Sequence, residues 1–145
     1  MTSTFAVHAH RLDVVGAAEM AGLDRSAVLD TIERLDTAVA AIDGHGFTPT
    51  PFGPQSALAE AIGLDGAELW VKDETGNVSG SHKGRHLFGV ALGLALTETQ
   101  PERLAIASCG NAAFAASVVG LPKSLKAYVL SFAKLLAAMV FALSY

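Results

Sequence analysis

The segment Leu104-Ala105-Ile106-Ala107-Ser108-Cys109-Gly110-Asn111 decides the fold that the sequence predicts. Its first four residues are apolar and short enough for a buried strand, and the next three form a turn. Residues 111–119 then favour a helix opened by Gly110, and residues 126–130 favour a second strand. Because two strands joined by one helix are typical of a parallel βαβ unit, this segment predicts an α/β protein.

The residues upstream extend the alternation of strands and helices. Residues 67–72 alternate in polarity and include Trp70 and Val71, which favours a strand, and a helix is predicted at about residues 82–97. The order β-α-β-α-β predicts a partial three-layer parallel sheet with flanking helices. Ligands bind at the carboxyl ends of such strands, so the loop after residue 72 and the turn after residue 107 are predicted to converge.

The N-terminal third is predicted to be helical. Apolar residues recur at helical spacing between residues 11 and 42, and Asp24 is placed as an N-cap. Glycines and prolines from residue 44 onward break the helix, and a short helix is expected at residues 56–62. The predicted organisation is a helical extension at 1–46, a partial α/β domain at 47–131 and an apolar tail at 132–145.

Composition limits the classes of function. The chain has 145 residues, enough for one domain, and a formal net charge of -4, which argues against a nucleic-acid partner. Cys109 is the single cysteine, so an intramolecular disulfide is excluded and a reducing compartment is favoured. The N-terminus lacks the apolar core of a signal peptide. We therefore expect a cytoplasmic protein.

The C-terminal residues 127–145 are very apolar, with Lys134 as their one charge. A membrane span would bury Lys134 at a cost of about 2.5–3.5 kcal/mol. We prefer a core helix here and expect no membrane partner. A truncation or a reading-frame change is equally consistent with the abrupt loss of acidic residues, and such a tail would favour self-association. A homo-oligomer is therefore left open.

The turn Ser79-Gly80-Ser81-His82-Lys83-Gly84-Arg85 carries the chemistry that the sequence predicts. A lysine by itself is usually a solvated charge. Here small residues leave room beside Lys83, and both burial and the positive end of a helix dipole favour the neutral amine. A neutral amine can hold an aldehyde as a Schiff base and later move an α-proton as a general base.

Four separated motifs strengthen this interpretation. In chain order they are Thr48–Phe52, Glu68–Asn77, Ser79–Arg85 and Ala107–Ala113. In this order they resemble the fold-type-II pyridoxal-phosphate enzymes, the group of threonine synthase, threonine dehydratase, cysteine synthase and the tryptophan synthase β chain. The resemblance covers residues 48–119. It implies the N-terminal portion of such an enzyme, because family domains normally run to about twice this length or more.

The resemblance also implies roles for individual residues. Lys83 would hold pyridoxal 5'-phosphate and act as the catalytic base, and Asn111 would contact the cofactor's phenolic oxygen. A turn would grip the carboxylate of the amino-acid substrate through Ser108, Cys109, Gly110, Asn111 and Ala112. The implied reaction is β-elimination or β-replacement by a lyase. Since the family's phosphate loop has no counterpart here, the alternative is a non-catalytic truncated remnant that acts only through assembly or its apolar tail.

The sequence gives little support for other kinds of site. His82 and His86 are four residues apart but have no third ligand at suitable spacing, so no metal site is predicted. The glycines between residues 76 and 84 match neither a P-loop nor a dinucleotide turn. The thiol of Cys109 is interpreted as structural, and Asp73 and Glu74 as solvated loop acids.

Overall fold

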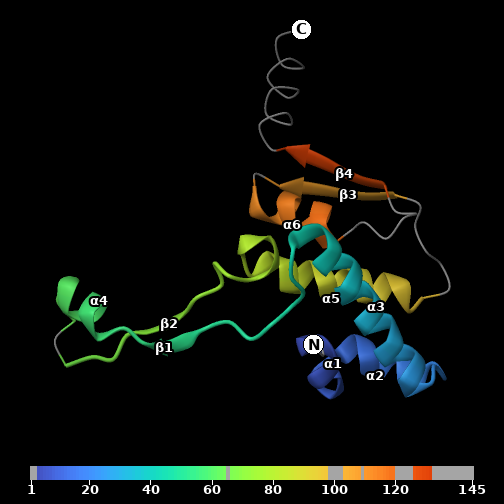
Figure 1. Cartoon of the computed structure of the whole chain (residues 1–145), viewed down its shortest axis with the longest axis horizontal. Helices are drawn as coiled ribbons and strands as arrows, with labels where there is room; N and C mark the ends of the chain where they lie inside the picture. The colour runs from blue at the N-terminus through green and yellow to red at the C-terminus, as the bar shows by residue number, and fades with distance from the viewer. Residues whose placement is uncertain (1–2, 65, 98–102, 109, 120–125, 132–145) are drawn as a thin grey trace, which may run out of the picture.

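The computed structural model describes residues 3–64, 66–97, 103–108, 110–119 and 126–131. Six α-helices, two 3₁₀ turns and four strands occur in these residues (Figure 1). In chain order they are α1 (Thr4–Val7), η1 (Ala9–Arg11), α2 (Asp13–Met20), α3 (Arg25–Asp43), β1 (Phe52–Pro54), α4 (Ser56–Ala61), β2 (Trp70–Lys72), η2 (Val78–Gly80), α5 (Lys83–Ala95), β3 (Arg103–Ser108), α6 (Asn111–Val119) and β4 (Lys126–Ser131).

The predicted partial three-layer parallel sheet is wrong. The described chain is a mostly helical small domain, and its strands form two separate two-stranded ladders. β1 and β2 make an antiparallel hairpin, with Phe52 opposite Lys72 and Pro54 opposite Trp70. β3 and β4 run parallel, but β2 does not join them. The βαβ unit at residues 103–131 therefore forms without the larger sheet that the strand order predicted.

The pairing of β2 with β1 has a local cause. The chain turns back through α4, so the two strands meet across a short connection, and a hairpin costs less loop entropy than a distant parallel pairing. The Gln55 N–H donates to the Leu69 carbonyl at 2.8 Å, and the Asp73 N–H donates to the Pro51 carbonyl at 2.9 Å. Polarity alternation predicted the strand at residues 67–72, but it contains no information about the partner strand.

The helical predictions for the N-terminal third are confirmed. Asp24 caps α3, because its carboxylate accepts the Ser26 N–H at 3.0 Å. α3 ends at Gly44, whose φ of 90° is left-handed and whose N–H donates to the Ala40 carbonyl at 3.0 Å. The buried residues Val28, Ile32, Leu35, Asp36 and Val39 lie on one side of α3 and face the other helices.

Three phenylalanines form the centre of the hydrophobic core. Phe88 of α5 is fully buried, and its ring centroid lies 4.4 Å from that of Phe5 and 4.9 Å from that of Phe47. Phe5 and Phe47 meet edge to face at 5.0 Å. These residues are distant in sequence, so the cluster joins α1, the segment after α3, and α5 into one body.

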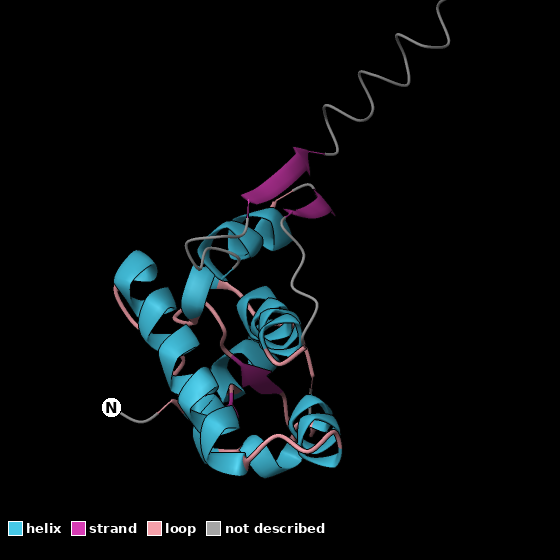
Figure 2. Ribbon diagram, turned by 90° about the vertical axis from the view of Figure 1, so that its right-hand side faces the viewer, coloured by secondary structure: helices cyan, strands magenta, loops and turns pink. Residues whose placement is uncertain are grey.

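The helix predicted at residues 111–119 is confirmed as α6, which packs against α5 and the β3–β4 ladder. Figure 2 shows this ladder at one end of the molecule, beyond the helices. No helix of the described ranges is long and apolar enough to cross a membrane. The tail at residues 132–145 lies outside the described residues.

Candidate functional site

Lys83 is the first residue of α5 and is half-buried. The tight turn η2 precedes it, and Ser79 there has a left-handed φ of 61°, which is uncommon for a residue with a side chain. Two hydrogen bonds close the turn: the Gly80 N–H donates to the Asn77 carbonyl at 2.8 Å, and Asn77 Nδ2 donates to the Ser81 carbonyl at 2.9 Å. The segment leading to Lys83 is therefore held in one conformation.

Three buried oxygens in this turn have no hydrogen-bond partner among the described residues. They are Asn77 Oδ1, Ser79 Oγ and Ser81 Oγ, on residues that are each more than nine-tenths buried. A buried polar atom without a partner costs about 1–3 kcal/mol, so each of these three atoms needs a physical explanation. These three residues lie within six positions of Lys83 in the sequence.

The C-terminus of α3 holds the turn from the other side. The backbone N–H of Ser79 donates to both carboxylate oxygens of Asp43, at 3.2 Å each. His45 Nε2 lies 3.5 Å from Asp43 Oδ2. Asp43 thus stabilises the left-handed backbone conformation of Ser79. The Ser79 hydroxyl takes no part in these bonds and has no partner among the described residues. Sequence reasoning missed Asp43 because it lies 36 residues away.

Gly84 allows the turn to approach α5 closely. A Cβ at this position would lie 2.6 Å from the Val78 carbonyl oxygen and 3.3 Å from Ser79 Oγ. Real side chains do not approach a backbone atom this closely, so only glycine fits here. The sequence suggested that small residues such as Gly84 leave room for a cofactor's ring beside Lys83, but the space at Gly84 is occupied by the Val78 backbone.

The turn before α6 is organised by Ser108. Its Oγ accepts the Gly110 N–H at 3.2 Å and the Ala113 N–H at 3.1 Å, so it caps the helix. Gly110 and Asn111 are exposed and Ala112 is half-buried. Cys109, the other predicted substrate-binding residue, lies outside the described residues.

The lysine turn and α6 are neighbours, although the reason differs from the prediction. Strands β2 and β3 belong to different ladders, so their carboxyl ends do not share a sheet edge. α6 instead packs directly against η2 and α5. This contact between helices brings the element that carries Asn111 to the turn that precedes Lys83.

Glu74 belongs to a charge network that the sequence did not reveal. Arg85 Nε lies 3.0 Å from Glu74 Oε2, Lys72 Nζ lies 3.2 Å from Glu74 Oε1, and Thr50 Oγ1 donates to Glu74 Oε1 at 2.5 Å. The Glu74 side chain is 15% exposed, so its interpretation as a solvated loop acid is wrong. The same interpretation fits the exposed Asp73, whose carboxylate accepts the Thr75 N–H at 2.9 Å.

The network sets the protonation of Glu74. Burial raises the pKa of Glu74, but hydrogen bonds from Thr50, Arg85 and Lys72, together with the Arg85 charge, outweigh burial and lower the pKa to about 2. The ordinary value is 4.5. A depressed pKa means that the carboxylate stabilises the folded state fully above pH 4.5 and that this contribution is lost as the pH falls toward 2.

We expect acid to destabilise the protein through Glu74. Its contribution at pH 7 is about 1–2 kcal/mol after allowance for the partly exposed Arg85 and Lys72. Urea unfolding between pH 7 and pH 3 should show a steeper loss of stability for the wild type than for Glu74→Gln. The matched control is Glu60→Gln at an exposed position. Parallel pH profiles for the wild type and Glu74→Gln would contradict the prediction.

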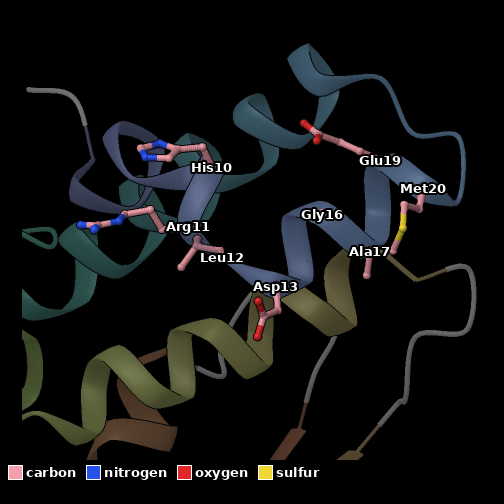
Figure 3. A pocket seen from close by; sticks show the side chains of 8 residues that line it. All are labelled: His10, Arg11, Leu12, Asp13, Gly16, Ala17, Glu19 and Met20. Atoms are coloured by element: carbon pink, nitrogen blue, oxygen red, sulfur yellow. The ribbon is translucent and has the colours of Figure 1, made fainter.

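A concave surface lies beside α2, and Lys83 is not among the residues that line it. It is an open groove of about 730 Å³ whose lining includes His10, Arg11, Asp13 and Glu19 (Figure 3). In Figure 3 these side chains point in different directions, so they do not converge on a common ligand atom. Within the described ranges, no group of three or more His, Cys, Asp or Glu residues is arranged to hold a metal ion.

Comparisons of the chain with protein-family profiles, with curated proteins and with solved structures find no match.

Proposed function

We propose that the chain binds pyridoxal 5'-phosphate through Lys83 and takes part in amino-acid chemistry of the lyase class. The observation that supports this proposal is a half-buried lysine at the start of α5, which directly follows the turn that contains the partnerless oxygens of Asn77, Ser79 and Ser81. An aldehyde cofactor with a charged phosphate and several ring substituents offers both a partner for the amine and partners for such oxygens.

The residues present fit the cofactor in the following way. Lys83 would hold its aldehyde covalently, and the hydroxyls of Ser79 and Ser81 would donate hydrogen bonds to its oxygens. Asn111 is exposed at the start of α6, where its amide is free to contact the ring oxygen. When bound, pyridoxal phosphate acts as an electron sink that stabilises negative charge next to the α-carbon of an amino acid.

Substrate binding and proton transfer would be carried out by groups of the protein itself. The N–H groups in the first turn of α6 have no acceptor within the helix, and those of Asn111 and Ala112 suit the carboxylate of an amino-acid substrate. Ser108 acts here as a positioning residue, since its hydroxyl holds Gly110 and Ala113 in place. The Lys83 amine, once free, would move the α-proton in β-elimination or β-replacement. A single cysteine is consistent with this chemistry in a reducing cytoplasm.

Borohydride trapping tests the proposal. The purified chain is incubated with pyridoxal phosphate and reduced, and the modified lysines are located by peptide mass mapping. We expect one label per chain, at Lys83, because this lysine directly follows the turn that contains the unused hydrogen-bonding groups. Lys72 serves as an internal control, since its ammonium is engaged by Glu74.

Two variants sharpen this test. Lys83→Arg keeps the positive charge and removes the reactive amine, so the label and the cofactor's absorbance band should both be lost. Ser81→Ala keeps the lysine and removes one buried hydroxyl, and should weaken cofactor binding roughly tenfold. Equal labelling of Lys72 and Lys83, or no labelling in a chain whose circular dichroism shows it folded, would overturn the proposal.

A further inference from the structure

We propose that Asp43 is a positioning residue for Lys83, a role that rests on the function proposed above for the lysine. Asp43 is the last residue of α3, and its side chain is 13% exposed. Its carboxylate accepts the Ser79 N–H and lies near His45. The effect on Lys83 therefore passes through Ser79 and the turn η2, which directly precedes α5.

A carboxylate at this position is unfavourable for α3 itself. The C-terminal end of a helix carries a partial negative charge, which repels acidic side chains. The last turn of α3 contains no basic side chain that would compensate. His45 Nε2 lies 3.5 Å from Asp43 Oδ2, but the His45 side chain is 47% exposed, and an ion pair so open to solvent contributes little to stability. The contact that explains an acid here is the one with Ser79.

The backbone conformation of Ser79 needs a support from outside the turn. Ser79 is the one described residue other than glycine with a positive φ, at 61°. This left-handed conformation is unfavourable for a residue with a Cβ and persists only where the surroundings hold it. Its N–H donates to both carboxylate oxygens of Asp43 at 3.2 Å. Because bonds to a charged acceptor are stronger than bonds between neutral groups, Asp43 is suited to hold Ser79 in place.

The peptide unit between Val78 and Ser79 connects Asp43 to α5. This unit is planar, so its N–H and its C=O point in opposite directions. Asp43 binds the N–H, and the carbonyl oxygen lies so close to Gly84 that a Cβ there would be 2.6 Å away. Fixing the N–H therefore fixes the carbonyl against the first turn of α5. Gly84 directly follows Lys83, so the orientation of this peptide unit sets the backbone that carries the lysine.

Asn77 supplies a second link between the turn and α5. Its Nδ2 donates to the Ser81 carbonyl at 2.9 Å, and the Gly84 N–H donates to the same carbonyl at 3.3 Å. The turn and the first turn of α5 are thus bound to each other, and Asp43 attaches both to α3. Loss of the carboxylate should release the segment that holds Lys83.

A double-mutant cycle tests this role. Asp43→Ala removes both acceptors and should slow borohydride-trapped labelling of Lys83 by about tenfold. Ser79→Gly removes the need for a support, because glycine adopts a left-handed φ without strain. In a chain that already carries Ser79→Gly, adding Asp43→Ala should therefore change the labelling rate by less than about twofold. A carboxylate that acts elsewhere in the fold would give the same ratio in both chains.

Hydrogen exchange makes the test independent of the cofactor. In the free chain, NMR should show the Ser79 and Gly84 amides exchanging about tenfold faster in Asp43→Ala than in the wild type. Asp43→Asn keeps one acceptor oxygen and should give an intermediate rate. The matched control is Asp30→Ala, which removes an exposed carboxylate from the same helix and should alter neither exchange nor labelling. Circular dichroism checks that each variant is folded, and Asp43→Asn replaces Asp43→Ala in the cycle if the latter is not.

The outcomes distinguish this inference from the proposed function. Faster exchange at both amides, in a wild type that pyridoxal phosphate does not label at Lys83, would support the positioning by Asp43 and overturn the proposed function. Labelling at Lys83 that is unchanged in Asp43→Ala, with unchanged exchange, would do the reverse. Equal effects of Asp43→Ala with and without Ser79→Gly would also overturn the inference.

Discussion

Replacing Phe88 by alanine is expected to lower the free energy of unfolding by about 3–5 kcal/mol. Phe88 is fully buried and contacts the rings of Phe5 and Phe47, so its removal leaves a cavity where three segments meet. Neither neighbouring ring can fill that space without giving up its own contacts. Because small domains are stable by only about 5–15 kcal/mol, a sizeable part of the total stability is lost.

Urea unfolding followed by circular dichroism measures this loss as a shift of the midpoint. The matched control is Phe114→Ala in α6, which removes the same ring from a side chain that is 58% exposed. We expect that control to change stability by less than about 0.5 kcal/mol. Equal effects of the two substitutions would show that Phe88 is not at the centre of the core.

Replacing Gly84 by alanine is expected to destabilise the protein by about 2–3 kcal/mol. The added Cβ would lie 2.6 Å from the Val78 carbonyl oxygen, and a backbone atom cannot move as easily as the end of a side chain. Either η2 or the first turn of α5 must shift. Since Ser81 and Lys83 lie between Val78 and Gly84 in the chain, labelling at Lys83 should fall along with stability.

Gly89 provides the control within the same helix. A Cβ at Gly89 meets nothing within 4 Å, so Gly89→Ala should stabilise α5 by about 0.5–1 kcal/mol through helix propensity alone. Thermal unfolding of the two variants separates the effects, because they share the same chemical change. A stabilising Gly84→Ala would contradict the close packing of η2 against α5.

Local sequence patterns predicted the elements well. The cap at Asp24, the short helix near residue 56, the helix after His82 and the helix starting at Asn111 all appear within a few residues of the predicted positions. These features depend on side chains within one or two turns of each other. Helix capping and hydrophobic spacing act at that range, so a single sequence is sufficient to indicate them.

The arrangement of the strands was predicted incorrectly for a physical reason. An alternating strand such as residues 67–72 can pair with any edge that suits it, and the pattern does not specify the edge. The short return through α4 makes β1 the nearest partner, which leaves the β3–β4 ladder with two strands. The hairpin and its exposed Trp70 could be found only in the tertiary structure.

In the candidate site, too, some features follow from local sequence and others from tertiary packing. The sequence by itself determined that Lys83 begins a helix after a tight, small-residue turn and that Asn111 begins another, because glycine, serine and asparagine have strong local preferences at such positions. Only the tertiary structure decided that Asp43 holds Ser79, that Glu74 pairs with Arg85, and that α6 lies against η2. These contacts join residues far apart in the chain, and which of them form depends on how the whole core packs rather than on any local pattern.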